Sequence, residues 1–206
     1  MNAVAKRILN VKEAAESRRS IRKYKPDPIP REQLEEILSL ALKAPSANNL
    51  QPWRIAVVQD PTLKERLREA ANNQAQVSAA PTVLVIYSDM KDTLDHVEET
   101  FHPGFPPEEV AARAERIRNM WAPRSDQERE TWGVGQAYIL LGYLTLLLKA
   151  YGYDSNPIGG FNPAKVKEAL DLPAHVAIAA LLPAGIAAEE GYYHHRHPLN
   201  RVVQWR

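Results

Sequence analysis

The chain reads P-S-A-N-N-L-Q-P-W from Pro45 to Trp53, between a segment with helical spacing of its apolar residues and a short apolar run. The two prolines restrict the backbone of this stretch. The side-chain amides of Asn49 and Gln51 each offer a donor and an acceptor, which suits the edge of a heterocyclic ligand. Trp53 is expected in the core rather than stacked on a ligand. The stretch therefore predicts a shaped polar loop that links a helix to a strand.

A second motif, R-R-S-I-R at residues 18–22, follows the first expected helix. Arginines around a serine suit a phosphate group, to which each charge-assisted hydrogen bond contributes roughly 1.5–3 kcal/mol. Residues 1–31 carry nine basic and three acidic side chains, and His194 to Arg206 carries three arginines and three histidines without an acid. Two basic ends predict a local anion site shared by both, and two solvated faces are the alternative.

The composition of the 206 residues is that of an ordinary globular protein, with 45% hydrophobic and 25% charged residues. The net charge of +1 gives no argument for a nucleic-acid partner. The chain has no cysteine, which excludes disulfides, cysteine-bound metals and thiol nucleophiles and agrees with a cytoplasmic location. The most apolar run, Val134 to Leu148, is short for a membrane span, so no membrane association is expected.

Apolar spacing predicts an α+β fold, or α/β sandwich, as a single domain over residues 1–206. Asp60 and Asn162 each precede a proline and are expected to cap the helix that follows. The strand candidates are apolar on both faces, so helices are expected to cover the sheet on both sides. The expected helices are 3–17, 31–44, 61–71, 106–121, 132–150 and 163–170, and the expected strands are 55–58, 82–87 and 176–182, with a short one near 202–203.

Residues 89–131 differ from the rest of the chain, because they are polar and charged and are interrupted by four prolines. They include an Arg/Glu-rich helix without a broad apolar face. We expect an insertion that lies over the domain as a mobile lid and selects the substrate. A structural arm wrapped on a partner subunit is the alternative. The side chains expected to line the lid are Phe101, Phe105, Met120 and Trp121.

Several well-known signatures are absent from the sequence: G-x-G-x-x-G, the P-loop, H-E-x-x-H and G-x-S-x-G. The run His194, His195 and His197 could suggest a metal. Adjacent histidines on an extended segment point to opposite faces, however, and no carboxylate flanks them. We expect no metal site.

Together, the motifs at residues 18–22 and 45–53 resemble those of the FMN-dependent nitroreductase family. The resemblance covers nearly the whole chain and includes N-P-I-G-G-F at residues 156–161 and the basic tail from His194 to Val203. It implies a nitroreductase-like fold with a mixed central sheet, in an intertwined homodimer with FMN at the subunit interface. It also implies a ping-pong reaction in which hydride passes from NADH or NADPH through N5 of FMN to a nitroaromatic, a quinone or a similar acceptor.

The resemblance also assigns roles at the phosphate end of FMN. Arg18 and Arg196 match a cationic pair at the phosphate, and Arg19 and Ser20 match residues along the phosphate and ribityl chain. Gln136 matches a glutamine near the same chain. Its alternative role is that of a core amide whose hydrogen bonds are satisfied internally.

At the ring, Arg22 matches a cation near the N1 edge, where positive charge stabilises the reduced flavin. Pro157, Gly159 and Gly160 match a loop whose backbone approaches N5, and glycine permits such close approach. Asn73 is assigned to the pyrimidine end, with Asn72 as the alternative. The residues expected to reach the FMN of the partner subunit are Pro45, Ser46, Ala47 and Asn49.

Two positions depart from the family pattern. Gly159 stands where an acidic residue is common, and His194 stands where a lysine is common. The histidine predicts an FMN affinity that depends on pH. Alternative functions are a flavin-dependent dehydrogenase, a dehalogenase, a flavin-destroying enzyme or a flavin-binding protein without turnover. The sequence does not distinguish NADH from NADPH or identify the acceptor.

Overall fold

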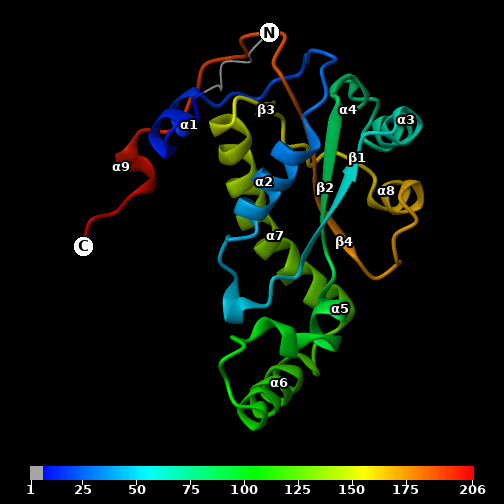
Figure 1. Cartoon of the computed structure of the whole chain (residues 1–206), viewed down its shortest axis with the longest axis vertical. Helices are drawn as coiled ribbons and strands as arrows, with labels where there is room; N and C mark the ends of the chain where they lie inside the picture. The colour runs from blue at the N-terminus through cyan, green and yellow to red at the C-terminus, as the bar shows by residue number, and fades with distance from the viewer. Residues whose placement is uncertain (1–6) are drawn as a thin grey trace.

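A computed structural model describes residues 7–206, in which a four-stranded sheet lies between two groups of helices (Figure 1). The strand order is β1-β2-β4-β3. The strands are β1 (Trp53–Val58), β2 (Thr82–Ser88), β3 (Asp154–Ser155) and β4 (Ala177–Gly185). The helices are α1 (Val11–Ser17), α2 (Arg31–Ala41), α3 (Pro61–Ala70), α4 (Ala75–Ala79), α5 (Met90–Asp95), α6 (Pro107–Trp121), α7 (Asp126–Ala150), α8 (Pro163–Ala169) and α9 (Leu199–Val202), with short 3-10 turns η1 (Ala47–Asn49) and η2 (Val97–Thr100).

The sheet has antiparallel ladders between all neighbouring strands of the described chain. The parallel part of the expected mixed sheet is reduced to one bridge, between Ser20 and Ser155 of β3. Along β2 the side chains alternate, so that Leu84 joins one apolar cluster and Val85 joins another on the opposite face. Both faces of the central strands are buried, as their continuous apolar character predicts.

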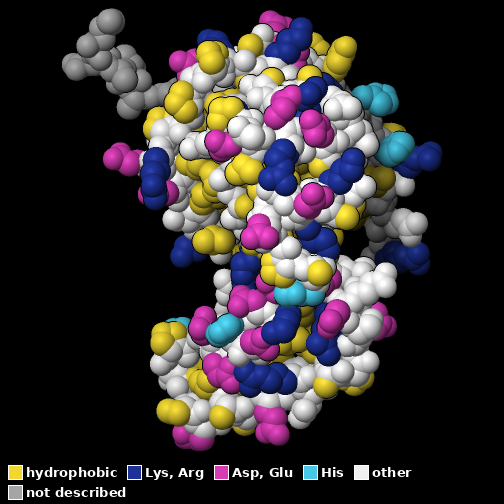
Figure 2. All heavy atoms as spheres, turned by 90° about the vertical axis from the view of Figure 1, so that its right-hand side faces the viewer, with side chains coloured by type: hydrophobic (Ala, Val, Ile, Leu, Met, Phe, Trp, Pro, Cys, Tyr) yellow, Lys and Arg dark blue, Asp and Glu magenta, His cyan; other side chains and the backbone are white. Residues whose placement is uncertain are grey.

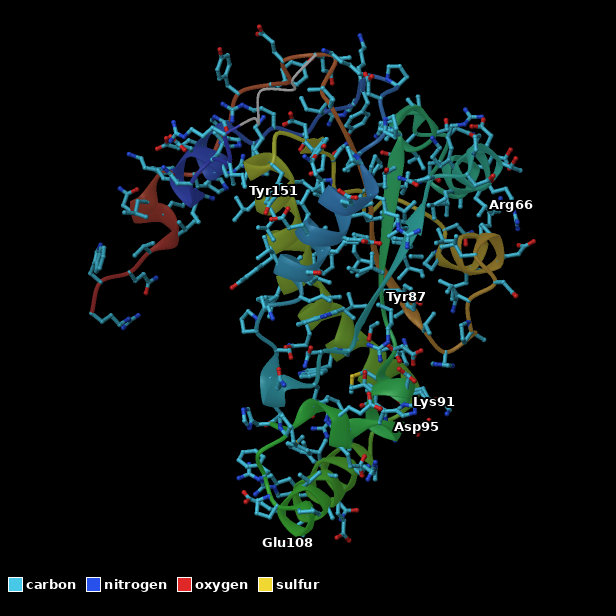
Figure 3. All side chains as sticks on the ribbon, viewed as in Figure 1. Arg66, Tyr87, Lys91, Asp95, Glu108 and Tyr151 are labelled. Atoms are coloured by element: carbon cyan, nitrogen blue, oxygen red, sulfur yellow. The ribbon has the colours of Figure 1, made fainter. Side chains whose placement is uncertain are left out.

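Helices α2 and α7 cover one face of the sheet, and α3, α4 and α8 cover the other (Figure 1). Within each layer a hydrogen bond joins two helical segments, and Figure 3 labels one residue of each bond, Tyr151 and Arg66. The hydroxyl of Tyr151, just after α7, donates to Glu36 of α2 at 2.6 Å. On the other side, Arg66 of α3 donates to the carbonyl of Glu168 in α8 at 3.2 Å. The sheet is therefore held between two layers that are each linked internally.

The long helix α7 begins six residues earlier than the expected start at residue 132. Ser125 accepts a hydrogen bond from the Glu128 N–H, and the Glu128 carboxylate accepts from the Ser125 N–H, which is a capping box. In the described chain, α7 is the one helix long and apolar enough to cross a membrane by length and composition. One face of α7 packs on α1, α2 and the sheet, and Tyr138, Ile139 and Tyr143 are exposed elsewhere on the helix.

The expected insertion at residues 89–131 forms a separate lobe of α5, η2 and α6, set off from the main body by a notch (Figure 2). Its helix α6 does have an apolar face, because Ala114, Ile117 and Trp121 are buried. These residues belong to a small core of their own with Met90 and Val97. The stripe is narrow, because its residues lie three and four apart, so the helix lacks a broad apolar face as expected, but the stripe is enough to pack the lobe's own core.

Both ends of the chain differ from expectation. Arg7 to Asn10 are not helical, because Asn10 caps α1 and accepts a hydrogen bond from the Glu13 N–H. The remaining start of the helix expected at 3–17 falls on residues 1–6, outside the described range. Near Val202 the chain forms the short helix α9 instead of a strand, because no sheet edge of the described chain lies beside it. The tail carrying α9 projects away from the body (Figure 1).

Candidate functional site

The loop from Ser46 to Gln51 has an unusual backbone. Asn48, Asn49 and Gln51 have φ angles of 54°, 56° and 46°, which is the left-handed region that residues with a side chain rarely adopt. The Ser46 hydroxyl accepts a hydrogen bond from the Gln51 N–H at 3.0 Å and holds the turn closed. Backbone strain of this kind clusters at ligand sites. The loop is thus shaped in advance, as its sequence predicts.

Gln136 lies on α7 beside this loop. Its Oε1 accepts a hydrogen bond from the Ala47 N–H at 3.0 Å. The side chain therefore bonds within the protein, as in the alternative role considered for it, and its own amide N–H groups remain available as donors. Pro45, Ser46, Ala47 and Asn49 lie together in the loop, and the Asn49 amide donates to the Thr100 carbonyl in the lobe at 2.6 Å.

The second motif runs alongside β3. Ser20 bridges Ser155, and the Ile21 N–H donates to the Ser155 carbonyl at 3.3 Å. The Arg22 N–H donates to Glu189 Oε1 at 2.7 Å. The Arg22 side chain is exposed, and its guanidinium lies 3.5 Å from the Ser20 carbonyl. Because Ser155 leads directly into residues 156–160, the tertiary structure places the arginine motif beside the start of the segment that carries the glycine loop.

Four cationic or titratable side chains meet at one end of this motif: Arg18, Arg19, His194 and Arg196. The Arg19 guanidinium lies 3.4 Å from Nε2 of His194 and 5.5 Å from the centre of the Tyr193 ring. Burial, followed by repulsion from Arg196 and Arg19, lowers the pKa of Arg18. Desolvation, followed by repulsion from Arg19, lowers the pKa of His194. Among residues 7–206, none of the three arginines has an acidic side chain within ion-pair distance.

The glycine loop is held by two amides from the turn after α3. Asn72 donates to the Gly160 carbonyl at 3.1 Å, and Gln74 donates to the same oxygen at 3.0 Å. The structure thus brings Asn72 to the loop, while the Asn73 N–H donates to the Arg68 carbonyl. Gln74 was missed in the sequence, where nothing distinguishes it from other exposed amides. Pro157, Gly159 and Gly160 are exposed and open to a ligand.

Three of the four side chains expected in the lid line one hollow, and the fourth is buried. Phe101, Phe105 and Met120 line a hollow of about 510 Å³ in the lobe, together with Asn49. Trp121 does not line the hollow, because it is 4% exposed and packs against Trp132 with ring centres 4.7 Å apart. The grouping of all four around one ligand was therefore wrong, since successive helix positions 120 and 121 point about 100° apart.

A buried polar cluster joins the lobe to the body, and the sequence offered no motif for it. Glu130 of α7 is 4% exposed, and its Oε1 accepts the Met90 N–H at 2.7 Å. Burial raises the pKa of the Glu130 carboxyl. Asp89 caps α5 and pairs with Nε2 of His175 at 3.0 Å. Farther along α5, Lys91 pairs with Asp95 on the exposed face (Figure 3).

The chain is similar to known proteins over most of its length. A sequence model described as the nitroreductase family matches residues 15–186. The chain belongs to the nitroreductase family. It is 54% identical over 199 residues to a protein of Thermus thermophilus named NADH dehydrogenase, with 97% of each chain covered. It is 36% identical to a Bacillus subtilis protein assigned as NAD(P)H nitroreductase YdgI, covering 94% of this chain and 96% of the relative.

A solved structure extends this nitroreductase likeness to three dimensions. A protein from Exiguobacterium sibiricum, assigned as a nitroreductase and crystallised in complex with FMN, superposes with a TM-score of 0.88 at 30% identity. The match covers 98% of this chain and all of the other. The nitroreductase-like fold expected from the sequence is confirmed.

Proposed function

We propose that the chain is an FMN-dependent NAD(P)H oxidoreductase that reduces nitroaromatic, quinone or similar acceptors. One observation carries the proposal: beside the strand that leads into Gly160, Arg18, Arg19 and Arg196 meet with no acidic side chain of residues 7–206 within ion-pair distance. A phosphate would relieve the repulsion between these cations, and an exposed glycine loop next to it suits a flat ring. The FMN in the matched structure and the names of the two relatives support the proposal.

The chain's own residues would divide the work along the cofactor. Arg18, Arg19, Arg196 and His194 would hold the phosphate, with Ser20 beside them. Arg22, exposed and without an ion pair among the described residues, would place positive charge at the ring. The two amides on the Gly160 carbonyl would hold the loop rigid, so that its backbone meets the ring without reorganisation.

FMN, when bound, supplies two-electron chemistry: it takes up hydride from the nicotinamide nucleotide and delivers two electrons to the acceptor. For a quinone the balance is NADH, one proton and quinone giving NAD⁺ and hydroquinone. For a nitro compound the same input gives a nitroso compound and water. No protein general base is needed in either case. The protein binds, orients and shields, which agrees with the lack of a hydrolase or phosphotransferase signature.

We infer that the working unit is a homodimer with FMN at the subunit interface. The projecting tail leaves Tyr192, Tyr193 and Trp205 more than four-fifths exposed, and α7 exposes Tyr138 and Tyr143. Aromatic surface of this extent marks an interaction site. Pro45, Ser46, Ala47 and Asn49 would then serve the FMN of the neighbouring subunit. A cytoplasmic location stays an expectation from the sequence.

The decisive experiment is to purify the protein, release its chromophore by heat and identify it by chromatography. We expect FMN and not FAD. Anaerobic addition of NADH or NADPH should bleach the flavin, and a nitroaromatic or quinone should restore its colour. Stable flavin that neither nucleotide reduces would favour a binding protein without turnover. Sedimentation equilibrium should give a flavin-loaded dimer, and a flavin-loaded monomer would contradict the interface.

A further inference from the structure

The hollow in the insertion lobe combines flat apolar surface with positive charge. We propose that it selects electron acceptors that are planar, aromatic and negatively charged, such as aromatic carboxylates, and that Arg116 binds their negatively charged group. The inference deepens the proposed function and depends on it. The hollow measures about 510 Å³, which is enough for a one- or two-ring compound.

The charge at the hollow comes from helix α6. Arg113 is paired with Glu109, and Arg118 is paired with Glu98. Arg116 also lines the hollow, and it has no hydrogen bond or ion pair to an acidic side chain within the described chain. It is therefore the arginine of α6 whose charge is not compensated. A guanidinium in this position can form a forked, charge-assisted pair with an incoming carboxylate.

The apolar part of the hollow suits a ring. Phe105 is 37% exposed and Met120 is 43% exposed, and both line the hollow with Phe101. The Arg113 guanidinium lies 4.6 Å from the centre of the Phe105 ring, which holds one ring face in place. Exposed aromatic and thioether side chains at a concave surface favour binding of a flat aromatic compound.

The hollow is also connected to the proposed cofactor site. Its wall includes Asn48 and Asn49 of the strained loop, and Asn49 donates to the Thr100 carbonyl in the lobe. This loop is the one proposed to reach the FMN of the neighbouring subunit. A ligand in the hollow would therefore touch the same segment that borders the flavin. The lobe supplies the charge and the ring contacts, and the loop supplies the link to the redox centre.

The test compares 4-nitrobenzoate with its neutral methyl ester as acceptors of the flavin-loaded protein. The quantity is the ratio of their kcat/KM values. Arg116→Gln should lower this ratio about two- to fivefold, which is the range that an exposed charge pair gives. Arg116→Lys should keep most of the preference. Lys165→Gln, an exposed charge on helix α8 of the main body (Figure 1), is the matched control and should leave the ratio unchanged.

Binding of 2-naphthoate, which is not reduced, gives a second readout by calorimetry. We expect weaker binding to Arg116→Gln and, for the wild type, weaker binding as salt is added. If no acceptor is ever reduced, the proposed function fails, while the naphthoate result still decides the role of the hollow. An unchanged ratio, an equal effect of Lys165→Gln, or a rise in KM for NADH alone would overturn the inference. The last outcome would place the nicotinamide nucleotide in the hollow instead.

Discussion

Gln136 Oε1 accepts a hydrogen bond from the Ala47 N–H at 3.0 Å, and this bond joins the core helix α7 to the strained loop that follows α2. The two residues are 89 positions apart in the sequence. The loop holds three residues other than glycine with positive φ, so it needs contacts from outside to keep its shape. The rigid helix supplies one such contact. The geometry of the proposed flavin site therefore depends on the Gln136 bond, which fixes the loop, as well as on the groups that would touch the flavin.

Gln136→Ala should weaken FMN binding several-fold, because the lost bond contributes about 0.5–1.5 kcal/mol to the order of the loop. Gln136→Glu is the informative control, since a carboxylate still accepts from the Ala47 N–H. FMN dissociation constants can be measured by the return of flavin fluorescence. Recovery in Gln136→Glu supports the anchoring role. Loss in both variants would show that the amide N–H groups act directly on the cofactor.

Arg18→Ala and Arg22→Ala should change different properties of the enzyme, namely FMN affinity and flavin potential. Arg18 lies in the cation cluster, so its loss should mainly raise the FMN dissociation constant. Arg22 is proposed to lie at the ring, so its loss should lower the flavin potential and slow reduction by NADH. Redox titration and FMN binding measured on both variants separate the two roles. The same profile for both would refute the assignment.

His194 should make FMN affinity depend on pH. Its pKa is below the ordinary value of 6.5 in the free protein. A bound phosphate favours the imidazolium and so raises the histidine pKa, and the histidine's contribution to affinity should therefore grow as the pH falls and be complete below the pKa in the free protein. Lysine at position 194 would be charged at both pH 5 and pH 8, so His194→Lys should improve FMN binding more at pH 8 than at pH 5. An improvement of equal size at both pH values would remove His194 from the phosphate site.

Glu130→Gln should stabilise the protein above neutral pH. Burial raises the pKa of Glu130 in the folded state, so folding favours the neutral acid. The neutral acid's contribution to the unfolding free energy is fully present below the unfolded-state pKa, and it is lost as the pH rises through the folded-state pKa. Glutamine still accepts from the Met90 N–H without burying a charge. The gain in unfolding free energy, measured in urea, should therefore grow from pH 4 to pH 8.

Glu130→Ala tests the hydrogen bond that Glu130 accepts, rather than its charge. It leaves the Met90 N–H at the start of α5 without its acceptor, which costs about 1–3 kcal/mol for a buried donor. The loss relative to the wild type should be larger at acid pH than at neutral pH, because alanine also removes the penalty of a buried charge, and hydrogen exchange should rise first in α5. If Glu130→Gln and Glu130→Ala were equally destabilising, the hydrogen bond to Met90 would not matter.

Trp121→Ala should unfold or loosen the lobe rather than change the ranking of acceptors. Trp121 is buried among Ala114, Ile117 and Met90, so its removal leaves a large cavity worth about 3–5 kcal/mol. Faster hydrogen exchange confined to residues 89–131 would support this prediction. Met120→Ala is the matched variant, because Met120 lines the hollow and is partly exposed. A shift in acceptor preference with Trp121→Ala and no loss of stability would restore the lid role.

Much of the fold was predictable because its signals are local. Asp60 and Asn162 do cap α3 and α8, accepting from Leu63 and Lys165. The apolar runs at β1, β2 and β4 form strands at the expected places, and β1 and β2 are rich in β-branched residues, which favour extended backbone. The early start of α7 was missed even though its capping box at Ser125 is local as well, since the polar first turn hides the apolar period.

By itself the sequence determined the three long strands, the chemistry of the two motifs, through those motifs the family, and six of the nine described helices, while the short helices α4, α5 and α9 were not predicted. Only the tertiary structure decided which distant groups meet. It placed His194 beside Arg19, chose Asn72 over Asn73 at the Gly160 carbonyl, and left Arg116 unpaired at the hollow while burying Trp121. The physical reason is that propensity, capping and periodicity act within one or two turns, whereas these contacts depend on loop closure and packing over tens to hundreds of residues.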